Sequence, residues 1–171
     1  MKIMFVCHGN ICRSPMAEFI FKDLAKKKGI ADHFLVASSA TSTEEIWNGI
    51  GNPVYPPAKV ELERYGLSCD GKRAVQLQKS DYDKYDLFIG MDSANIRNML
   101  RIFGGDPAGK VHKLMDYTPR GGDFTKRGEK EKYEMDLRCP CHCISFHLKA
   151  IPINRDESEN PLPNASKPKD E

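Results

Sequence analysis

Hydrophobic residues gather into four short runs in the first two-thirds of the chain, and polar segments separate these runs. In the first run, residues 2–6, the apolar residues are continuous rather than alternating, which is typical of a strand buried on both faces of a parallel sheet. We therefore predict buried strands at residues 2–6 and 85–92, a further strand at 33–40 and a fourth strand candidate at 110–116.

Three intervening stretches place apolar residues three and four positions apart, the spacing of a helix with one buried face. They predict helices over residues 15–28, 57–65 and 96–103. In the first helix, Ser14 is the expected N-cap, Pro15 the expected first position and Gly29 the expected stop. Strands that alternate with helices imply parallel strands joined by crossover helices, so the predicted fold class is α/β with a doubly wound sheet.

The organisation of the chain changes after about residue 123. The full length of 171 residues suits one domain with a substantial core. Residues 124–153 are highly charged and then rich in cysteine, while residues 154–171 have the polar, proline-rich composition typical of disorder. We therefore divide the chain into a domain over residues 1–123, an atypical segment over 124–153 and a tail over 154–171.

The composition of the chain argues against several classes of protein. The 26 Lys and Arg residues nearly balance the 24 Asp and Glu residues, which argues against the basic field of a nucleic-acid or membrane-surface binder. The apolar N-terminal run is too short for a signal peptide or a membrane span. The six cysteines lack the spacing of a secreted disulfide framework, so we expect a cytoplasmic location.

The segment VCHGNICRS, residues 6–14, joins the first predicted strand to the first predicted helix. Ligands bind beyond the carboxyl ends of strands in such a sheet, and a helix N-terminus offers backbone N–H groups to an anion. Gly9 and Asn10 tolerate the left-handed backbone that turns these groups inward. Arg13 adds a planar fork matched to two oxygens of a tetrahedral oxyanion, so the segment predicts an oxyanion site.

Cys7 is the expected nucleophile of this site. A helix N-terminus and a neighbouring cation favour the thiolate, which is the reactive form of cysteine. A thiolate inside an anion site suits attack on phosphorus, with Arg13 and backbone amides stabilising the charge of the transition state. The alternative, that Cys7 is a small buried apolar residue, is weakened by the strand, turn and helix around it.

The segment VCHGNICRSPMAE resembles the active-site loop of the low-molecular-weight protein-tyrosine phosphatases, through the pattern Cys-x-Gly-Asn-x-Cys-Arg-Ser. The likeness continues through ASSATS, WNGIGNPVYPPA, DLFIGMD and KVHKLMDYTPRGGD, and so covers about residues 1–123. It implies a three-layer sandwich around a mainly parallel four-stranded sheet. It also implies an enzyme that hydrolyses phosphotyrosine through a phosphocysteine intermediate and needs no metal or cofactor. The implied substrates are phosphotyrosine-containing proteins or small aryl phosphates.

Position by position, the resemblance implies Cys7 as the nucleophile, Arg13 as the phosphate-binding residue and Ser14 as support for the thiolate. Asn10 would hold the shape of the loop, and Cys12 would form a reversible disulfide with Cys7, unless Cys12 merely packs. The implied phosphate-binding loop consists of His8, Gly9, Asn10, Ile11, Cys12, Arg13 and Ser14.

Three further residues match the family outside the loop. Trp47 resembles the aromatic wall of the phosphotyrosine pocket, although a single Trp is also common in protein cores. Asp92 and Asn95 match the family pattern Met-Asp-x-x-Asn, while a simple helix N-cap is an equally open role for Asp92.

The sequence departs from the family at the proton donor. A phenol leaving group, with a pKa of about 10, needs a proton, and the family supplies it from an Asp-Pro pair after the fourth strand. Here the only such pair, Asp106-Pro107, precedes that strand and is expected at the opposite edge of the sheet. Asp123 is a weak candidate, and Asp116 is expected to be a turn or cap carboxylate. Loss of a general acid typically slows a reaction about 10²–10⁴-fold.

The sudden loss of pattern near residue 123 leads to the hypothesis that the coding frame shifts there. Translation of the neighbouring frame tests it, since an Asp-Pro pair followed by aromatic residues is expected in that frame.

Two other functions stay open. An arsenate reductase of the same fold needs extra cysteines to relay a disulfide, and Cys69 is the only further cysteine in the resembling region. A catalytically weak phosphate- or phosphotyrosine-binding protein would also fit the missing acid. A zinc site is not expected, because Cys139, Cys141 and Cys143 alternate instead of forming spaced pairs.

Overall fold

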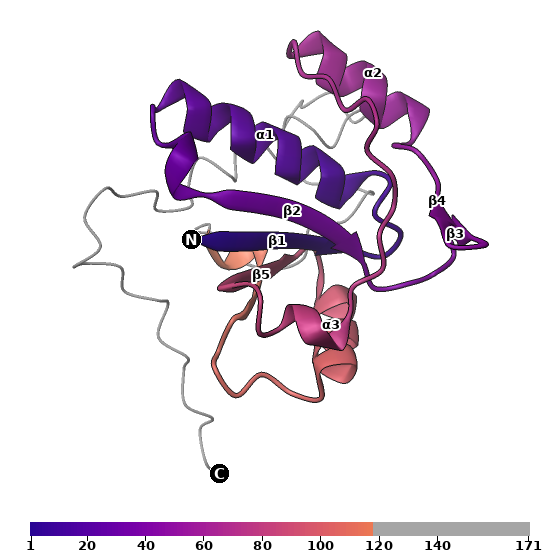
Figure 1. The fold of residues 1–171 in the computed structure, drawn as a ribbon, viewed down its shortest axis with the longest axis vertical. Coiled ribbons are helices and arrows are strands. Elements are labelled where there is room, and N and C mark those ends of the chain that lie inside the picture. The colour runs from indigo at the N-terminus through magenta and orange to yellow at the C-terminus, as the bar shows by residue number, and fades with distance from the viewer. Residues whose placement is uncertain (118–171) are drawn as a thin grey trace, which may run out of the picture.

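A computed structural model describes residues 1–117 of the chain. Within these residues the four predicted strands form one sheet in the order β2-β1-β5-β6, and every pairing is parallel (Figure 1). The strands are β1 (Lys2–Cys7), β2 (Leu35–Ala40), β5 (Leu87–Gly90) and β6 (Val111–Lys113). The prediction of a doubly wound α/β fold is therefore confirmed.

Helices cover both faces of this sheet and complete the three layers (Figure 1). The α-helices are α1 (Arg13–Lys27), α2 (Pro56–Arg64) and α3 (Ser93–Phe103). Short 3₁₀ helices cover Ala31–His33, Lys79–Asp81 and Leu114–Tyr117. Helices α1 and α2 share one hydrophobic cluster on one face, and α3 belongs to a second cluster on the other.

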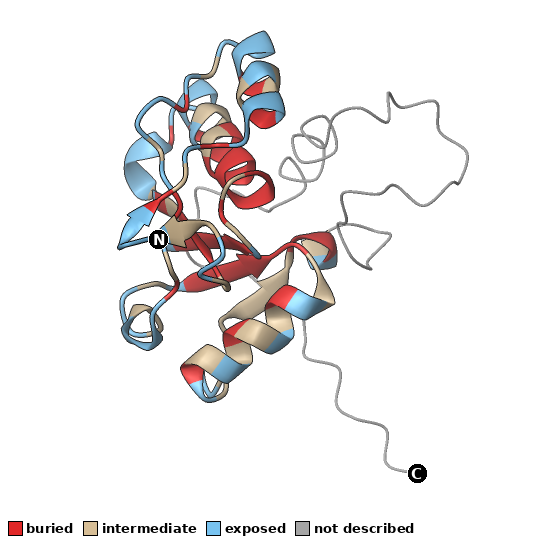
Figure 2. Ribbon diagram, turned by 90° about the vertical axis from the view of Figure 1, so that its right-hand side faces the viewer, coloured by how far each residue is buried: buried red, intermediate tan, exposed pale blue. Residues whose placement is uncertain are grey.

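Strand β1 divides its side chains between these two clusters. Ile3 and Phe5 pack on the side of α1, whereas Met4 and Val6 pack on the side of α3. Successive side chains of a strand point to opposite faces, so a strand that is apolar at every position is buried on both sides. Figure 2 shows this central strand buried along its length after Lys2. Its carboxyl end is consequently a fixed point from which the next residues leave the sheet.

The start of α1 differs from the prediction. The helix begins at Arg13, with Cys12 at the N-cap position, and Ser14 is not its N-cap. Instead, the Ser14 hydroxyl lies 3.1 Å from the Cys7 sulfur and accepts a hydrogen bond from the Asn10 side chain. Serine is a common N-cap residue, but here the Ser14 hydroxyl interacts with Cys7 and Asn10 of the preceding loop instead of capping the helix.

A two-stranded hairpin in residues 41–57 was not predicted. It pairs β3 (Ile46–Trp47) with β4 (Ile50–Gly51) in antiparallel register. Strands of two residues are too short to show an alternating pattern. The signal that was overlooked is the pair Asn48-Gly49, since Asn-Gly is the typical two-residue hairpin turn with positive φ at both positions. The observed φ values are 50° and 78°.

The hairpin is anchored to the segment that precedes β5. Gly51 lies against the backbone there, and a Cβ atom at this position would stand 1.9 Å from the carbonyl oxygen of Ala74. The Ala74 N–H donates to the carbonyl of Asn52 at 2.9 Å, and Pro53 forms a bridge with Arg73. Only glycine allows this close approach, so the hairpin is held at one end by backbone contact.

Several predictions lie outside the described residues. They concern Asp123, the segment 124–153 with its cysteine cluster, and the tail 154–171. Across residues 1–117, none of the helices has the length and apolar character needed to span a bilayer.

Candidate active site

The loop between β1 and α1 surrounds a small pocket at the carboxyl end of the central strand. Cys7 is the last residue of β1, and α1 begins only six positions later at Arg13. Asn10 makes the sharp turn with a φ of 55°, in the left-handed region that asparagine tolerates better than most residues. The turn therefore brings the first residue of the helix back beside the last residue of the strand.

Backbone contacts orient the peptide groups of this loop. The carbonyls of Cys7, His8 and Ile11 accept hydrogen bonds from neighbouring segments, donated by the N–H groups of Thr41, Ser42 and Tyr55 at 2.7–2.9 Å. In a planar trans peptide the carbonyl and the next N–H point in opposite directions. The N–H groups of the following residues consequently point toward the inside of the loop, where they can donate to an anion.

The Cys7 sulfur is buried and lies among hydrogen-bonding groups. The Asn10 N–H donates to it at 3.3 Å, and the Ser14 hydroxyl lies 3.1 Å away. A sulfur that accepts a hydrogen bond from the backbone of the loop and lines the pocket is held in place to face a bound group.

Arg13 is held by a carboxylate from the other half of the sheet. Its Nη1 donates to Asp92 Oδ2 at 2.7 Å, and both side chains are largely buried. The other oxygen of Asp92 accepts from the Asn95 N–H at 2.8 Å and caps α3. Asp92 therefore caps a helix, one of the roles that the sequence left open, and it also positions Arg13, which the sequence did not indicate.

The pocket itself has a cavity volume of about 90 Å³, room for one small oxyanion. Its lining comes from the loop and from one residue of the segment before the hairpin: Cys7, His8, Gly9, Ile11, Cys12, Arg13 and Glu45. The Glu45 side chain crosses close to Gly9, and its carboxylate accepts from the Asn52 side chain at 2.8 Å. At the exposed rim, His8 pairs with Glu44 at 2.9 Å.

The other predicted site residues lie apart from this cavity. Trp47 is on the hairpin and is 70% exposed. Asp106 precedes β6 and is therefore at the opposite edge of the parallel sheet from Cys7, as expected. It accepts from the Tyr82 hydroxyl at 2.6 Å and from two backbone N–H groups, which outweigh burial and lower the pKa of Asp106. Asp116 accepts from the Lys113 N–H at 2.8 Å, the turn role that was predicted.

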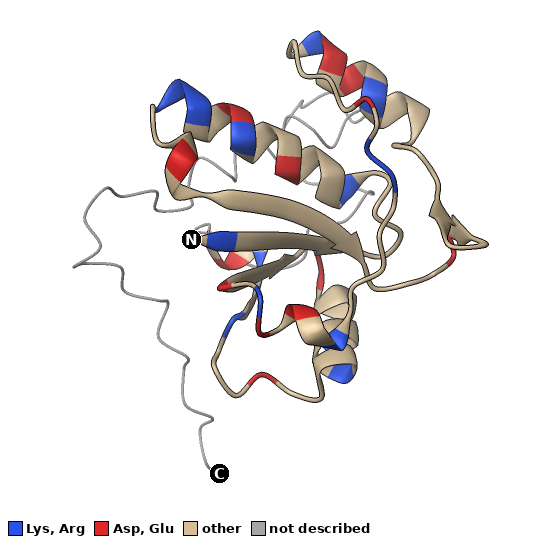
Figure 3. Ribbon diagram, viewed as in Figure 1, with Lys and Arg blue, Asp and Glu red and all other residues tan. Residues whose placement is uncertain are grey.

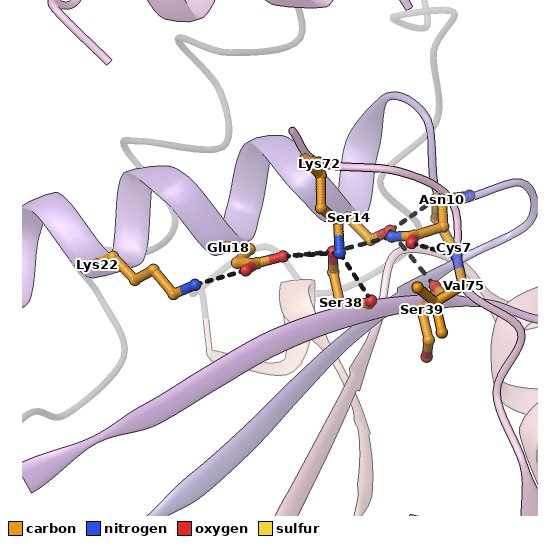
Figure 4. Close-up of polar contacts among 9 residues, drawn as sticks. All are labelled: Cys7, Asn10, Ser14, Glu18, Lys22, Ser38, Ser39, Lys72 and Val75. Carbon is orange, nitrogen blue, oxygen red and sulfur yellow. Dashed lines mark hydrogen bonds and ion pairs between the residues drawn. The ribbon is translucent and has the colours of Figure 1, made fainter. Parts of the chain in front are cut away.

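A group of residues behind the loop was missed by the sequence analysis. Glu18, Ser38 and Lys72 lie beneath Asn10 and Ser14 and form hydrogen bonds and ion pairs there (Figure 4). A signal was present for Glu18, because it stands four positions after Ser14 and therefore on the same side of α1. Figure 3 shows Lys and Arg interspersed with Asp and Glu along that helix, so Glu18 had no compositional feature of its own.

Comparisons with known proteins give the family. The family model of low molecular weight phosphotyrosine protein phosphatase matches residues 2–129. The low molecular weight protein-tyrosine-phosphatase YfkJ of Bacillus subtilis is 40% identical over 117 residues, which cover 68% of this chain and 72% of that protein. The low molecular weight phosphotyrosine protein phosphatase of Sus scrofa is 37% identical over 99 residues, and the match spans 58% of this chain and 60% of that protein.

A solved structure agrees with these matches. The crystal structure of YfkJ from Bacillus subtilis superposes with a TM-score of 0.74 at 32% identity, over 88% of this chain and 91% of that one. The similarity thus extends from the loop motif to the arrangement of the whole sheet. A match of this extent, in sequence and in fold, shows that the chain belongs to the low-molecular-weight protein-tyrosine phosphatase family of hydrolases.

Proposed function

We propose that this chain hydrolyses phosphotyrosine through a phosphocysteine formed on Cys7, and that its proton donor is impaired. In the first step the Cys7 sulfur attacks phosphorus, the sulfur–phosphorus bond forms, and the bond to the phenol oxygen breaks. In the second step water attacks phosphorus, and phosphate and the thiolate are released. The observation that carries the proposal is the Cys7 sulfur, which lines an oxyanion-sized pocket, accepts from the Asn10 N–H at 3.3 Å and lies 3.1 Å from the Ser14 hydroxyl.

Arg13 is the proposed clamp for the transferred phosphoryl group. Asp92 holds one edge of its guanidinium at 2.7 Å, and the residue lines the pocket together with Cys7. A guanidinium that a carboxylate holds in place loses less conformational freedom when it meets the oxygens of an oxyanion. Charge that grows on the equatorial oxygens in the transition state would meet Arg13 and the inward N–H groups of the loop.

The leaving group is the weak part of the proposed reaction. Glu45 is the carboxylate that lines the pocket within the described residues, and it is engaged by Asn52 as a hydrogen-bond acceptor. A carboxylate held as an acceptor is poorly suited to deliver a proton. Asp123 therefore stays the candidate proton donor. If it does not act, the hydrolysis rate of substrates with poor leaving groups is expected to be about 10²–10⁴-fold lower.

Rapid mixing of the full chain with 4-nitrophenyl phosphate tests the nucleophile. We expect a burst of nitrophenol whose amplitude matches the enzyme concentration, together with acid-stable phosphate on Cys7 by mass spectrometry. Cys7→Ser should abolish the burst, while Cys69→Ala, which changes another buried cysteine, should retain it. A burst of equal size in Cys7→Ser would overturn the proposal.

A second substrate tests the proton donor. Phenyl phosphate releases a more basic phenolate than 4-nitrophenyl phosphate does, so an enzyme without a general acid should show a rate ratio of about 10² or more between them. Asp123→Asn should leave this ratio unchanged if Asp123 does not act. A rise in the ratio in Asp123→Asn would identify it as the acid.

The physiological substrates are proposed to be phosphotyrosine-containing proteins. The reaction needs a reduced thiol at Cys7, so we place it in the cytoplasm. Arsenate reduction has less support, since Cys69 is buried and burial raises the pKa of its thiol, which disfavours the thiolate that a disulfide relay needs.

A further inference from the structure

The rim of the pocket carries a histidine and a carboxylate that the proposed reaction has not used. His8 directly follows the nucleophile in sequence and lines the pocket, and its Nε2 lies 2.9 Å from Glu44 Oε2. We propose that His8 donates the proton that the leaving phenol needs, and that Glu44 holds the ring of His8 in position. This role rests on the proposed function of Cys7 as the nucleophile.

Backbone contacts bring Glu44 to His8. The Ser42 N–H donates to the His8 carbonyl at 2.9 Å, and the Ser42 hydroxyl accepts from the Glu44 N–H at 3.2 Å. The segment that follows β2 is thereby held against the loop, although His8 and Glu44 are 36 positions apart. The fold thus positions both residues, whereas many surface ion pairs depend on two mobile side chains alone.

The other ionisable groups that line the pocket are less suited to give a proton. Cys7 is the nucleophile, and a guanidinium such as that of Arg13 is not deprotonated in proteins. The Glu45 carboxylate already accepts a hydrogen bond at 2.8 Å, and Cys12 is buried in the hydrophobic cluster on the side of α1. Among the lining residues within positions 1–117, His8 is therefore the best-suited proton donor.

Burial places His8 on the side of the pocket where the leaving group departs. Cys7 is 3% exposed, whereas the His8 side chain is 51% exposed. In phosphoryl transfer the attacking and leaving atoms lie roughly in line, on opposite sides of phosphorus. A sulfur that attacks from the buried side therefore directs the leaving oxygen toward the exposed rim, where His8 lies.

The pair with Glu44 determines which ring nitrogen faces the substrate. A charged imidazole ring has two N–H donors, and Glu44 accepts from Nε2. Within residues 1–117, Nδ1 of His8 has no hydrogen-bond partner. The Nδ1–H group is thus available to the leaving oxygen, while the carboxylate orients the ring from its other end.

The proton can be followed through both steps. The Cys7 sulfur forms its bond to phosphorus as the bond to the phenol oxygen breaks, and that oxygen takes the proton from Nδ1. The phenol leaves neutral, and His8 becomes a neutral imidazole. In the second step water attacks phosphorus from the same side and gives a proton to Nδ1 while the sulfur–phosphorus bond breaks. Phosphate and the thiolate are released, and the charged ring is restored.

A histidine donor gives the reaction a distinctive pH dependence. Histidine changes charge between about pH 5 and 8, so such a donor acts at low pH and is weakened near neutral pH. The charged groups around His8 are its partner Glu44, then Glu45 and Arg13 in the pocket lining, and Asp92, which pairs with Arg13. These groups and the nucleophile act on every aryl phosphate, so a ratio between two substrates isolates the donation of the proton.

The test measures kcat/KM of the full chain for 4-nitrophenyl phosphate and for phenyl phosphate across about pH 5.5–8. The ratio of the two values reports the need for a proton, because phenolate is the more basic leaving group. In the wild type the ratio should rise with pH as the ring loses its proton. His8→Gln should raise the ratio at pH 6 about tenfold and remove its pH dependence, since an amide has no proton to give.

A matched control is His33→Gln, which changes a histidine in the turn before β2. Because β1 and β2 are parallel, this turn lies at the opposite edge of the sheet from Cys7. The variant should therefore leave both the ratio and its pH dependence unchanged.

Two further variants separate the proton from the charge. His8→Arg keeps a cation beside Glu44, but a guanidinium does not release its proton, so this variant should show the same high ratio as His8→Gln. Glu44→Gln keeps an acceptor for the ring and removes the negative charge. We expect it to raise the ratio at pH 6 about threefold, because both side chains are largely exposed and solvent screens their interaction.

An unchanged ratio in His8→Gln would refute the proposal, as would a low ratio in His8→Arg. A rise in Asp123→Asn without a rise in His8→Gln would assign the proton to Asp123 and refute the proposal as well. Absence of a burst that depends on Cys7 would overturn the proposed function together with this inference. A burst with an unchanged ratio would overturn the role of His8 alone.

Discussion

The loop of residues 7–14 lines the pocket and the hairpin β3–β4 directly follows Glu45, which also lines it, but the loop and the hairpin are built in opposite ways. In the loop, Asn10, Arg13 and Ser14 are at most 8% exposed, and contacts reach them from β2, α3 and the segment before β5. On the hairpin, Trp47 is 70% and Ile50 63% exposed. Bond making requires groups held at fixed distances, whereas recognition of a substrate surface requires side chains that are available to it.

The largest effect is expected in the loop. Arg13→Lys should lower kcat/KM for 4-nitrophenyl phosphate about 10³-fold, because an ammonium cannot contact Asp92 and two phosphoryl oxygens in one plane. Steady-state kinetics measure this, with Arg97→Lys on the exposed side of α3 as the matched control. A loss under tenfold would show that the planar fork is not needed.

The anchor of the hairpin comes next. Gly51→Ala should destabilise the protein by about 3 kcal/mol, since its Cβ would stand 1.9 Å from the Ala74 carbonyl oxygen. Gly49→Ala is the control: it has a φ of 78° and no atom within 4 Å of the added Cβ, so it should cost only about 1 kcal/mol. Urea unfolding compares the two, and equal losses would mean that the close approach at Gly51 carries no special cost.

A substitution at the exposed tip of the hairpin should change substrate binding without changing the stability of the protein. Trp47→Ala should raise KM for an aryl phosphate about fivefold to tenfold through loss of ring stacking, if Trp47 forms the pocket wall. Its free energy of unfolding should change by less than about 0.5 kcal/mol, because the side chain is mostly in solvent. Val60→Ala on α2, which is also exposed, should change neither quantity. A KM within twofold of the wild type would remove Trp47 from the pocket.

The smallest effect concerns the pH dependence of the support beneath the loop. The pKa of Glu18 is lowered in the folded protein, so its ionised form stabilises the fold above its ordinary value of 4.5, and this stabilisation disappears as the pH falls through the lowered value. The wild type should exceed Glu18→Gln in Tm by about 5 °C above pH 5, and the difference should close toward about pH 3. Scanning calorimetry measures it. A gap that widens on acidification would contradict the lowered pKa.

The two regions also differ in how far sequence could predict them. The strands and helices followed from periodicity, because a buried strand or helix face repeats over many residues. The hairpin was not predicted, because its strands are two residues long and Asn48-Gly49 was the only sequence signal for it. Ser14 was misassigned as a cap because local pattern gives no information about the competing partners Cys7 and Asn10.

Contacts between distant segments were beyond pattern analysis. Arg13 and Asp92 are 79 positions apart and meet because β1 and β5 are neighbours and each ends in a turn at the same edge of the sheet. Ser38 meets Asn10 because β2 flanks β1 on the other side. The predicted doubly wound sheet allows β1 to lie between β2 and β5. The pairs of contacting residues could not be named, because the sequence did not predict the strand order.

Asp92 gives the enzyme an internal reporter. One of its oxygens holds Arg13 and the other accepts from the N–H of Asn95 in the first turn of α3. We expect an oxyanion that draws Arg13 toward itself to redistribute the hydrogen bonds of this carboxylate, which the Asn95 N–H shares. Occupancy of the pocket should therefore be readable as a chemical-shift and exchange-rate change at the Asn95 amide, which does not line the pocket and belongs to a helix on the opposite face of the sheet from α1.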